Sequence, residues 1–595
     1  MNGKKAGVVG LGTMGSNIAI VCARAGVETA VCEAGESLLE EGMGRVRAFL
    51  DAGVAKEKIS PGEREAILGR MTGTMEIEAL SDCDIVIEAI SEDRAAKSVL
   101  FNKLDGILKK EAILATNTST LSVSHLGAAS GRPDRVIGTH FCLPAALNKL
   151  VEVAPGRATS EETAAAAISF LEGAGQVPVR VKDSPGFILN LFLVPFQNDC
   201  IRLVETGYAT VQDIDTAIRL GLGQKMGPMR LLDIEGLDVF WSVARSLYDQ
   251  FQDPRFFPPP LVEKMIGAGY LGTKAGRGFY AYKKAGVFGV AEPEPGDIAP
   301  RETGAGEASA ETVKKVGVLG LGTMGSGIAQ VCATAGLEVL GVEMEESALE
   351  AGIGRVRKNL EEAVKRGKME EGKKEEILSR VQGATALRSL ADCDLVIEAV
   401  VENLEVKLAL FRELDALVKK EARFASNTSC LSVSAMAAQT KRPERTLGLH
   451  FFNPPYAMRL VEAVEAVQTS PETAEFGLAF CRRIGKTPVP VKDRPGFLVN
   501  RLLVPYLNQA VQAFDDGLAS REDMDKAVHM ALGHPMGPLT LLDLVGLDVQ
   551  EFVSLSMANE LGEGRFGPPP LLCRLTAAGW LGQKTGKGFY EHGGR

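Results

Sequence analysis

The sequence predicts an α/β domain followed by an all-α domain, with this pair written twice in one chain. Read against itself at an offset of 310 residues, the chain repeats without a gap, so that His140 falls on His450. The first part of each copy alternates short apolar strands with helical stretches, which is typical of a mostly parallel, doubly wound sheet. From residues 185 and 495 onward, the strand signals give way to helices with apolar residues three and four positions apart.

The length of the chain sets the number of domains. At 595 residues the chain is too long for one hydrophobic core, and each copy of about 280 residues splits into two domains on size alone. The stretch between Tyr282 and Val316 is rich in Pro, Gly, Glu and Ala and has no sustained period, so we expect a linker there. The predicted domains are 1–184 and 314–494 for the α/β pair, 185–283 and 495–595 for the helical pair, and 284–313 for the linker.

The linker allows the two copies to pair within one chain. About 30 coil residues span roughly 30 Å on average and reach further when stretched. We therefore expect an internal pseudo-dimer of the two halves, and the sequence leaves a higher oligomer open.

Composition excludes several classes of protein. Hydrophobic residues make up 45% of the chain and charged residues 24%, and no apolar run reaches the roughly 18 residues that a membrane span needs. The start of the chain runs straight into a strand and a glycine loop, so we expect no signal peptide and a cytoplasmic location. A net charge of -10 argues against a nucleic-acid partner, because phosphate backbones favour clustered Lys and Arg.

The ten cysteines do not indicate a metal site or a disulfide framework. None forms a CxxC pair. Cys22 and Cys83, with their counterparts Cys332 and Cys393, lie in apolar stretches where they would serve as small hydrophobic residues.

A GLGTMG motif follows the first strand of each copy and opens a helix. It comprises Gly10, Gly12, Thr13, Met14 and Gly15 in the first copy and Gly320, Gly322, Thr323, Met324 and Gly325 in the second. Its first two glycines permit a tight turn close to a pyrophosphate, which then lies at the positive helix N-terminus. Two such motifs in this context predict Rossmann-type dinucleotide-binding domains, with FAD as a possible alternative to NAD because it shares the fingerprint.

An acidic residue ends the second strand of each copy. Glu33 and Glu343 lie 18 residues past the last glycine of the motif. There a carboxylate accepts from the ribose hydroxyls and repels a 2′-phosphate. The sequence therefore predicts NAD rather than NADP as the cofactor.

Only His140 and His450 occupy equivalent positions among the six histidines. Each follows a strand, which places it at the carboxyl edge of the sheet beside the glycine loop. A neutral imidazole is a natural acceptor for a hydroxyl proton while the carbon gives its hydride to nicotinamide. We therefore expect a general base at these positions, although a structural histidine would also fit.

A glutamate lies twelve residues after each of these histidines, in a strand that reads as buried. Glu152 and Glu462 are flanked by valines, and a carboxylate there is costly unless it is paired. Pairing with the histidine would fix its tautomer and stabilise the imidazolium. A hydrogen bond to a helix end is the alternative role.

Further polar residues are shared by the two copies. An Asn-Thr-Ser run follows a strand at Asn117 to Ser119 and at Asn427 to Ser429, and both substrate binding and turn chemistry suit it. Asn190 and Asn500 open the helical domain, from which their side chains could reach a cleft between the domains.

These residues resemble the L-3-hydroxyacyl-CoA dehydrogenase family, which includes 3-hydroxybutyryl-CoA dehydrogenases. In the second half the resemblance runs through GLGTMGSGIAQ, SNTSCLSV, HFFNPPYAMRLVE, DRPGFLVNRLL and GQKTGKGFY. It implies NAD-dependent oxidation of the 3-hydroxyl of an acyl-CoA, reversibly and most simply on a short chain. The implied catalytic residues are His140, Glu152, Ser119 and Asn190, and His450, Glu462, Ser429 and Asn500. The implied cofactor contacts are Glu92, Lys97, Asn117, Glu402, Lys407 and Asn427, and Ser119, Ser429 and Asn453 are implied substrate contacts.

The first half departs from the family pattern near the histidine. Leu143 stands where Asn453 does, Leu191 replaces Arg501, and Lys225 replaces Pro535. Because one hydrogen bond to a substrate contributes about 1 to 3 kcal/mol, we expect the second half to be the better short-chain enzyme. The first half then prefers another acyl group or works slowly.

The sequence also allows two other hypotheses for the function. Related folds oxidise sugar acids such as gulonate, and one half could be a non-catalytic scaffold that only binds NAD. For the CoA phosphates, the sequence offers a basic stretch that would serve equally as a solvated face. It comprises Arg355, Arg357, Lys358, Lys365, Arg366 and Lys368.

Overall fold

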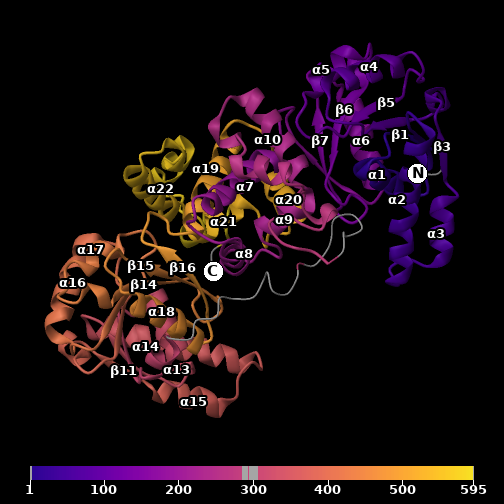
Figure 1. The fold of residues 1–595 in the computed structure, drawn as a ribbon. Helices are drawn as coiled ribbons and strands as arrows, with labels where there is room; N and C mark the ends of the chain where they lie inside the picture. Colours follow the sequence, from indigo (N-terminus) through magenta and orange to yellow (C-terminus); the bar gives the residue numbers. More distant parts are fainter. Residues whose placement is uncertain (1–2, 284–292, 294–305, 594–595) are drawn as a thin grey trace.

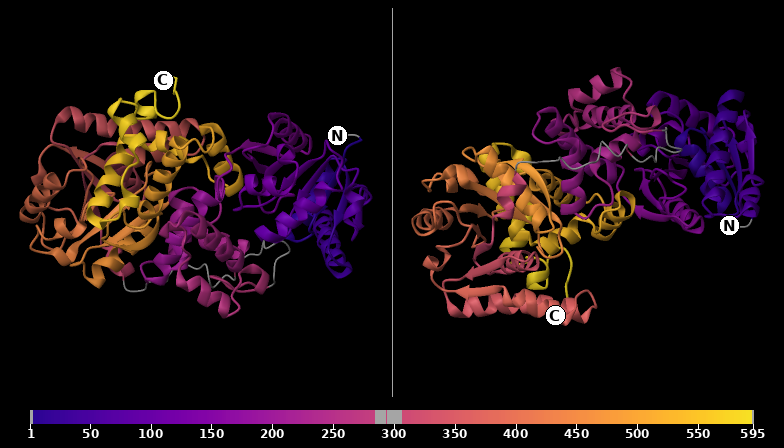
Figure 2. Two further views of the ribbon diagram at one scale, coloured as in Figure 1. Left: turned by 90° about the horizontal axis from the view of Figure 1, so that it is seen from above. Right: turned by 60° about the horizontal axis from the view of Figure 1, so that its bottom comes forward.

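The computed structural model describes residues 3–283, 293 and 306–593, and it confirms the predicted fold class in both halves. The α/β domains lie at the two ends of the molecule, and the helical domains lie between them (Figures 1 and 2). Each α/β domain holds an eight-stranded sheet, with the order β3-β2-β1-β4-β5-β6-β7-β8 in the first half and β11-β10-β9-β12-β13-β14-β15-β16 in the second.

The strands are short and mostly buried. In the first half they are β1 (Lys5–Val9), β2 (Glu28–Cys32), β3 (Met71–Thr74), β4 (Ile85–Glu88), β5 (Ile113–Thr116), β6 (Val136–Phe141), β7 (Leu150–Pro155) and β8 (Val177–Arg180). In the second half they are β9 (Lys315–Leu319), β10 (Glu338–Val342), β11 (Val381–Ala384), β12 (Leu395–Glu398), β13 (Arg423–Ser426), β14 (Thr446–Phe451), β15 (Leu460–Glu465) and β16 (Thr487–Lys492).

Strand direction and order create the functional edge of each sheet. All pairs are parallel except β6 with β7 and β14 with β15. Strand β2 lies on one side of β1, and β4 lies on the other side. The loops that follow β1 and β4 therefore lead away in opposite directions at the carboxyl edge of the sheet. Ligands of doubly wound sheets bind at this switch point.

Helices cover both faces of each sheet. In the first half they are α1 (Thr13–Arg24), α2 (Glu36–Ala55), α3 (Pro61–Leu68), α4 (Arg94–Asp105), α5 (Val123–Ala129) and α6 (Glu161–Gly173). In the second half they are α13 (Thr323–Thr334), α14 (Glu346–Lys365), α15 (Glu371–Ser379), α16 (Leu404–Leu417), α17 (Val433–Ala437) and α18 (Pro471–Arg483). The small residues of α1 and α13 are buried through most of each helix, which lets the helix approach the sheet closely.

A helical domain follows each sheet. The first contains α7 (Leu189–Glu205), α8 (Val211–Gly221), α9 (Pro228–Glu235), α10 (Leu237–Phe251) and α11 (Pro260–Gly267). The second contains α19 (Val499–Asp515), α20 (Arg521–Leu532), α21 (Pro538–Val545), α22 (Leu547–Leu561) and α23 (Pro570–Ala577).

The two halves pack together through these helical domains. Helices α7 and α19 pack against each other, and apolar side chains of both domains join one hydrophobic core. Helix α8 of the first half lies against β15 and β16, and α20 of the second half lies against β7 and β8. The Gln509 side chain donates to the Leu191 carbonyl at 2.6 Å, and Val181 forms a β-bridge with Ala519. Each helical domain therefore supports the α/β domain of the other half.

One part of the stretch 284–313 differs from the expected coil. Residues Gly306–Glu311 form helix α12, which packs on α18. Arg483 donates to the carbonyls of Ala310 and Val313 at 2.6 and 2.7 Å, and both of these residues are buried. This end of the predicted linker is therefore built into the second half, while residues 284–292 and 294–305 lie outside the described part of the chain.

Two further expectations concern membranes and cysteines. Among the described residues, no helix has the length and apolar character needed to cross a bilayer. Cys22, Cys83, Cys332 and Cys393 are all buried in apolar cores, as expected for small hydrophobic residues. Burial raises the pKa of the Cys22 thiol to about 12, so this cysteine stays protonated at neutral pH.

Candidate active site

A histidine and a glutamate face each other in both halves. His450 lies directly opposite Glu462 across the antiparallel strands β14 and β15, and its Nδ1 is 2.6 Å from Glu462 Oε2. His140 and Glu152 face each other across β6 and β7, also at 2.6 Å. The pairing that the sequence predicts is therefore present twice.

The glutamate is also held by the start of a helix. Glu462 is fully buried, and its second oxygen accepts from the backbone N–H groups of Leu498 and Val499 at 3.0 and 2.8 Å. These residues open α19, whose positive end favours a carboxylate. Glu152 accepts in the same way from the first turn of α7. These contacts compensate the buried charge. The glutamate therefore both pairs with the histidine and accepts hydrogen bonds from a helix end, the two contacts that the sequence left as alternatives.

This arrangement orients the imidazole. A carboxylate only accepts hydrogen bonds, so a neutral His450 shares its Nδ1 proton with Glu462 and presents Nε2 as an acceptor. The His450 ring also packs against Phe452 and Phe497, with ring centroids 4.7 and 5.7 Å away. The ring therefore has a defined orientation before any substrate arrives.

The Asn-Thr-Ser run of the second half connects the histidine strand to the helical domain. The Asn427 side chain accepts from the Phe451 N–H at 2.9 Å, next to His450. The Asn500 side chain donates to the Ser429 carbonyl at 3.2 Å. His450, Ser429 and Asn500 are therefore held around one edge of the sheet.

The first half reproduces part of this connection. Asn117 accepts from the Phe141 N–H at 2.9 Å, and the Ser119 N–H donates to Glu92 at 2.9 Å. Among the described residues, Asn190 makes no side-chain hydrogen bond to Ser119 that would correspond to the contact of Asn500. The first half therefore lacks this contact, although Ser246 and Gln250 of α10 donate to the hydroxyl and the carbonyl of Thr120 at 2.9 and 3.0 Å and connect its two domains.

The glycine loops fit a dinucleotide. Gly320 has a φ of 87°, and a Cβ on Gly325 would lie 1.7 Å from the Gly320 carbonyl, so the turn itself requires both glycines. A Cβ on Gly322 would meet no protein atom within 4 Å, so protein packing does not require this glycine. Close approach of a pyrophosphate to the backbone explains it. Gly10, Gly12 and Gly15 repeat the same geometry.

The acidic residue after the second strand is tied to this loop. Glu343 accepts from the Leu321 N–H at 2.5 Å, and Glu33 accepts from the Leu11 N–H at 2.5 Å. One carboxylate oxygen of each glutamate therefore holds the loop, and the second oxygen of Glu33 also accepts from the Ala34 N–H at 3.2 Å. Thr13, Met14, Thr323 and Met324 form the first turn of α1 and α13 beside it.

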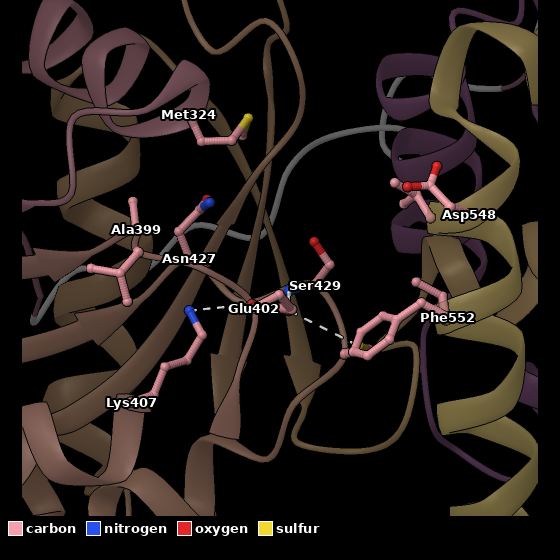
Figure 3. A pocket seen from close by; sticks show the side chains of 12 residues that line it. Met324, Ala399, Glu402, Lys407, Asn427, Ser429, Asp548 and Phe552 are labelled. Carbon is pink, nitrogen blue, oxygen red and sulfur yellow. Dashed lines mark hydrogen bonds and ion pairs between the residues drawn. The ribbon is translucent and has the colours of Figure 1, made fainter. Parts of the chain in front are cut away.

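A cavity of about 470 Å³ opens between the second α/β domain and α22 (Figure 3). Its lining includes Met324, Glu402, Lys407, Asn427 and Ser429, all of which the sequence analysis places at the cofactor or the substrate. From the helical side it is lined by Asp548, Val549, Phe552 and Val553. The cavity therefore brings these five predicted residues to one place, whereas His450, Asn500 and Asn453 are not part of its lining. In the described part of the chain, no cluster of His, Cys, Asp and Glu could hold a metal ion.

Sequence reasoning missed one buried carboxylate in each half. Glu398 and Lys407 form a buried ion pair at 2.6 Å, and Glu402 lies 3.2 Å from the same ammonium. Glu88, Lys97 and Glu92 repeat this group at 2.5 and 3.3 Å. The signal was a glutamate shared by both copies inside the apolar strand sequences DIVIEAI and DLVIEAV.

The ionisation of these carboxylates differs. Burial raises the pKa of Glu88, against the opposing effect of Lys97. For Glu92 the same burial is outweighed by Lys97, Thr118 and two backbone N–H groups, so its pKa lies below the ordinary value. Glu92 therefore stays ionised, and with Lys97 it fixes the loop that carries Ser119.

The substrate loops of the two halves differ as the sequence indicates. Asn453 is exposed beside the His450 site, whereas Leu143 is half-buried. Phe452 packs on His450, and its counterpart in the first half is Cys142. The His140 side chain is 14% exposed against 8% for His450, so the first histidine is less enclosed.

A tyrosine of the first half supports the second site. The hydroxyl of Tyr208 donates to the Phe497 carbonyl at 2.7 Å. Phe497 packs on His450 and immediately precedes the two N–H groups that hold Glu462. The counterpart of Tyr208 is Leu518, which has no hydroxyl, so this side-chain hydrogen bond has no equivalent at the first site.

Removing this hydroxyl should weaken the second site. In Tyr208→Phe we expect a loss of about 1 kcal/mol in unfolding free energy and roughly a fivefold loss in kcat, because one buried hydrogen bond is lost. Denaturant unfolding and steady-state kinetics measure the two effects. Leu518→Ala, at the counterpart position, should leave the kcat of the second site unchanged. An unaltered kcat in Tyr208→Phe would contradict the support described here.

A methyl group on Gly322 should block the second cofactor site without harming the fold. Gly322→Ala meets no protein atom, so we expect the same unfolding free energy and an NADH affinity lowered by about 2 kcal/mol, roughly 30-fold. Fluorescence titration with NADH measures this. The control is Gly354→Ala on α14, an exposed glycine that also has open space around it. Equal NADH affinity in Gly322→Ala and the wild type would contradict the assignment.

Comparison with known proteins defines the class to which this chain belongs. The family model for the NAD-binding domain of 3-hydroxyacyl-CoA dehydrogenase matches residues 5–184 and 315–494. The model for the C-terminal domain of the same enzyme matches residues 186–282 and 496–592. The chain therefore belongs to the 3-hydroxyacyl-CoA dehydrogenase family, in two tandem copies, and is an NAD-dependent oxidoreductase.

Individual relatives agree with this family. The 3-hydroxybutyryl-CoA dehydrogenase of Mycobacterium tuberculosis is 47% identical over 284 residues, which cover 47% of this chain and 99% of that protein. Human mitochondrial hydroxyacyl-coenzyme A dehydrogenase is 41% identical over 306 residues, with 50% and 96% coverage. The fold is also similar to the crystal structure of 3-hydroxybutyryl-CoA dehydrogenase from Escherichia coli K12, with a TM-score of 0.69 and 24% sequence identity. The match covers 98% of this chain and 100% of that chain.

Proposed function

We propose that this protein oxidises (S)-3-hydroxyacyl-CoA to 3-ketoacyl-CoA with NAD, reversibly. The observation that carries the proposal is the His450–Glu462 pair at 2.6 Å, held at the edge of the sheet where the cofactor loop ends. A general base, its orienting carboxylate and a nucleotide loop at one edge suit the removal of a proton and a hydride from a secondary alcohol.

The residues of the second half divide the chemistry among them. His450 Nε2 takes the proton of the 3-hydroxyl group, and Glu462 stabilises the imidazolium that results. The glycine loop and Glu343 would hold NAD, which would supply the acceptor for the hydride of the same carbon. We assign the holding of the reacting oxygen to the Ser429 hydroxyl and the Asn500 amide. The assignment is supported by the hydrogen bond from Asn500 to the Ser429 carbonyl and by the place of Ser429 in the cavity beside α22.

We assign short-chain substrates, with 3-hydroxybutyryl-CoA as the first example. The relatives at 47% and 42% identity carry the name 3-hydroxybutyryl-CoA dehydrogenase, and their matches cover nearly their whole length. Phe452 packs on His450, and Phe552 lines the cavity, so two apolar rings lie at the second site. We expect a small acyl group to bind beside them.

We assign most of the turnover to the second half. Its histidine has two aromatic neighbours, its Asn500 tie is formed, and Asn453 is present. In the first half, Leu143 removes the polar group, although the His140–Glu152 pair is intact. The first site therefore serves another acyl group or works slowly.

The CoA moiety has a basic candidate surface on α14. Arg355 is engaged with the Leu321 carbonyl at 2.9 Å, and Arg366 pairs with Glu362 at 2.7 Å. Arg357, Lys358, Lys365 and Lys368 are exposed on the same helix and just beyond it. These four cations are the ones that we expect to meet the CoA phosphates.

The arrangement of the whole protein completes the proposal. We propose four domains with boundaries at 184, 283, 313 and 494, with the two halves acting as an internal pseudo-dimer. The cysteines are free, and all but Cys573 are buried, which suits a reducing compartment, and we propose the cytoplasm.

The reverse reaction gives a direct test. Acetoacetyl-CoA should oxidise NADH in the presence of the intact protein, and NADPH should be a poor substitute because Glu33 and Glu343 repel a 2′-phosphate. Leu143→Asn should raise the activity of a His450→Ala variant, since it restores the polar group beside His140. Preference for NADPH, or no NADH consumption with any 3-ketoacyl-CoA, would refute the proposal.

A further inference from the structure

A second cavity, of about 450 Å³, lies between the two helical domains. The first half contributes to it from α7 and the 3-10 turn Pro254–Phe256, and the second half contributes from α19 and the 3-10 turn Gly564–Phe566. None of its lining residues belongs to the glycine loops or to the His–Glu pairs. It is therefore separate from both candidate active sites.

The lining of this cavity carries an excess of positive charge. Two carboxylates, Asp199 and Glu563, face five arginines. Arg565 lies 2.5 Å from Asp199 and 2.8 Å from Glu563, and Arg202 lies 3.1 Å from Asp199. Both carboxylates are thus already shared. A third arginine, Arg255, forms an ion pair at 2.7 Å with Asp253, which does not line the cavity.

The remaining two arginines have no carboxylate partner. Among the described residues, neither Arg494 nor Arg501 forms an ion pair, and each lies over the ring of Tyr208, at 5.3 and 5.8 Å. Nη1 of Arg501 is shielded from solvent and has no hydrogen-bond partner. Burial lowers the pKa of Arg501, so this guanidinium is already destabilised as a cation. A buried N–H group without a hydrogen-bond acceptor destabilises the folded protein, and a bound ligand that supplies an acceptor would remove this destabilisation.

Three of the five arginines have no arginine at the equivalent position of the other half, whereas Arg255 and Arg565 are counterparts of each other. At the offset of 310 residues, Arg494 corresponds to Ser184, Arg501 to Leu191 and Arg202 to Gln512. The related position at the other side of the interface therefore lacks three of the five arginines. Filling space between the two helical domains would not require these three additional arginines.

We propose that this cavity is a binding site for a small phosphate-bearing anion, one per chain, distinct from the cofactor and substrate sites. The planar guanidinium groups of Arg494 and Arg501 match the oxygens of a phosphate group, and the paired arginines of the opposite wall add a second set of donors. Arg501 directly follows Asn500, so an anion bound here contacts the helix that completes the second active site.

Calorimetric titration with inorganic pyrophosphate tests the proposal. The full chain is first saturated with NADH, so that the glycine loops are occupied. We expect one pyrophosphate per chain, and about a tenfold or greater loss of affinity in Arg494→Gln, because one unpaired charge is removed. Thr206→Glu, which adds a carboxylate to the same cavity while every arginine stays, should have the same effect. The control Arg388→Gln, an exposed arginine of the second α/β domain, should bind as the wild type does.

The outcomes separate the possible sources of the phosphate. Binding that persists when CoA is added supports a site for a free anion. Displacement by CoA with the same dependence on Arg494 would assign the cavity to the CoA part of the substrate and would overturn a distinct site. The proposal also fails if NADH-saturated protein binds no pyrophosphate, if two equal sites appear, or if both variants bind normally.

Discussion

His450→Ala should abolish nearly all NADH formation from (S)-3-hydroxybutyryl-CoA. The side chain is the candidate general base of the better half, and a positioned base contributes about 10²- to 10⁴-fold to a rate. The imidazole is partly enclosed, so its removal also costs packing against Phe452 and Phe497. For this reason the unfolding free energy has to be measured together with kcat.

His140→Ala is the matched control for this experiment. It removes the equivalent residue from the half whose substrate loop carries Leu143, and we expect kcat with the same substrate to fall by less than about half, since the second site supplies most of the rate. A double variant gives the full loss, because it also removes any residual rate from the first site. Equal losses from the two single variants would mean two equally competent sites and would contradict the assignment.

Glu462→Gln should reduce kcat by about 10³-fold while the protein remains folded. The change keeps the size of the side chain but offers an amide where His450 now meets a carboxylate. A glutamine N–H facing Nδ1 forces the proton to Nε2, which then cannot accept the proton of the substrate, and the imidazolium loses its counter-charge. We therefore expect kcat to fall far more than the affinity for NADH.

Glu152→Gln makes the same change in the first half. It should leave the rate with 3-hydroxybutyryl-CoA nearly unchanged, although the geometry of Glu152 matches that of Glu462. If Glu462→Gln retains more than about a tenth of the wild-type kcat, the carboxylate acts mainly as a structural ligand of α19, and the catalytic role of the pair would be wrong.

Local sequence patterns predicted much of this molecule. The GLGTMG turns, the strands that carry His140 and His450 near their carboxyl ends, and the shift to helices near residue 185 all depend on contacts between residues close in the chain. The two copies strengthened each of these signals, because a polar residue retained at the same buried position in both is unlikely to be accidental. The pairing of histidine with glutamate could be predicted because both residues lie in adjacent strands.

Contacts between distant parts of the chain could not be predicted in this way. The Tyr208 hydroxyl meets the Phe497 carbonyl only because α7 and α19 pack across the two halves. No periodicity or motif marks such a residue. Glu398 was recognisable as a shared acid in an apolar strand, but its ion pair with Lys407 depends on how α16 lies on the sheet. Helix α12 was hidden by a composition rich in glycine and alanine.

NADH formation by the intact protein from (S)-3-hydroxybutyryl-CoA, run in parallel with L-gulonate, tests the central claim most directly. We predict turnover with the CoA thioester, with acetoacetyl-CoA as product, and none above background with the sugar acid. Turnover of gulonate without CoA would place the protein among sugar-acid dehydrogenases. NADH binding without turnover of any 3-hydroxyacyl-CoA would contradict the account, because two intact His–Glu pairs would then serve no chemistry.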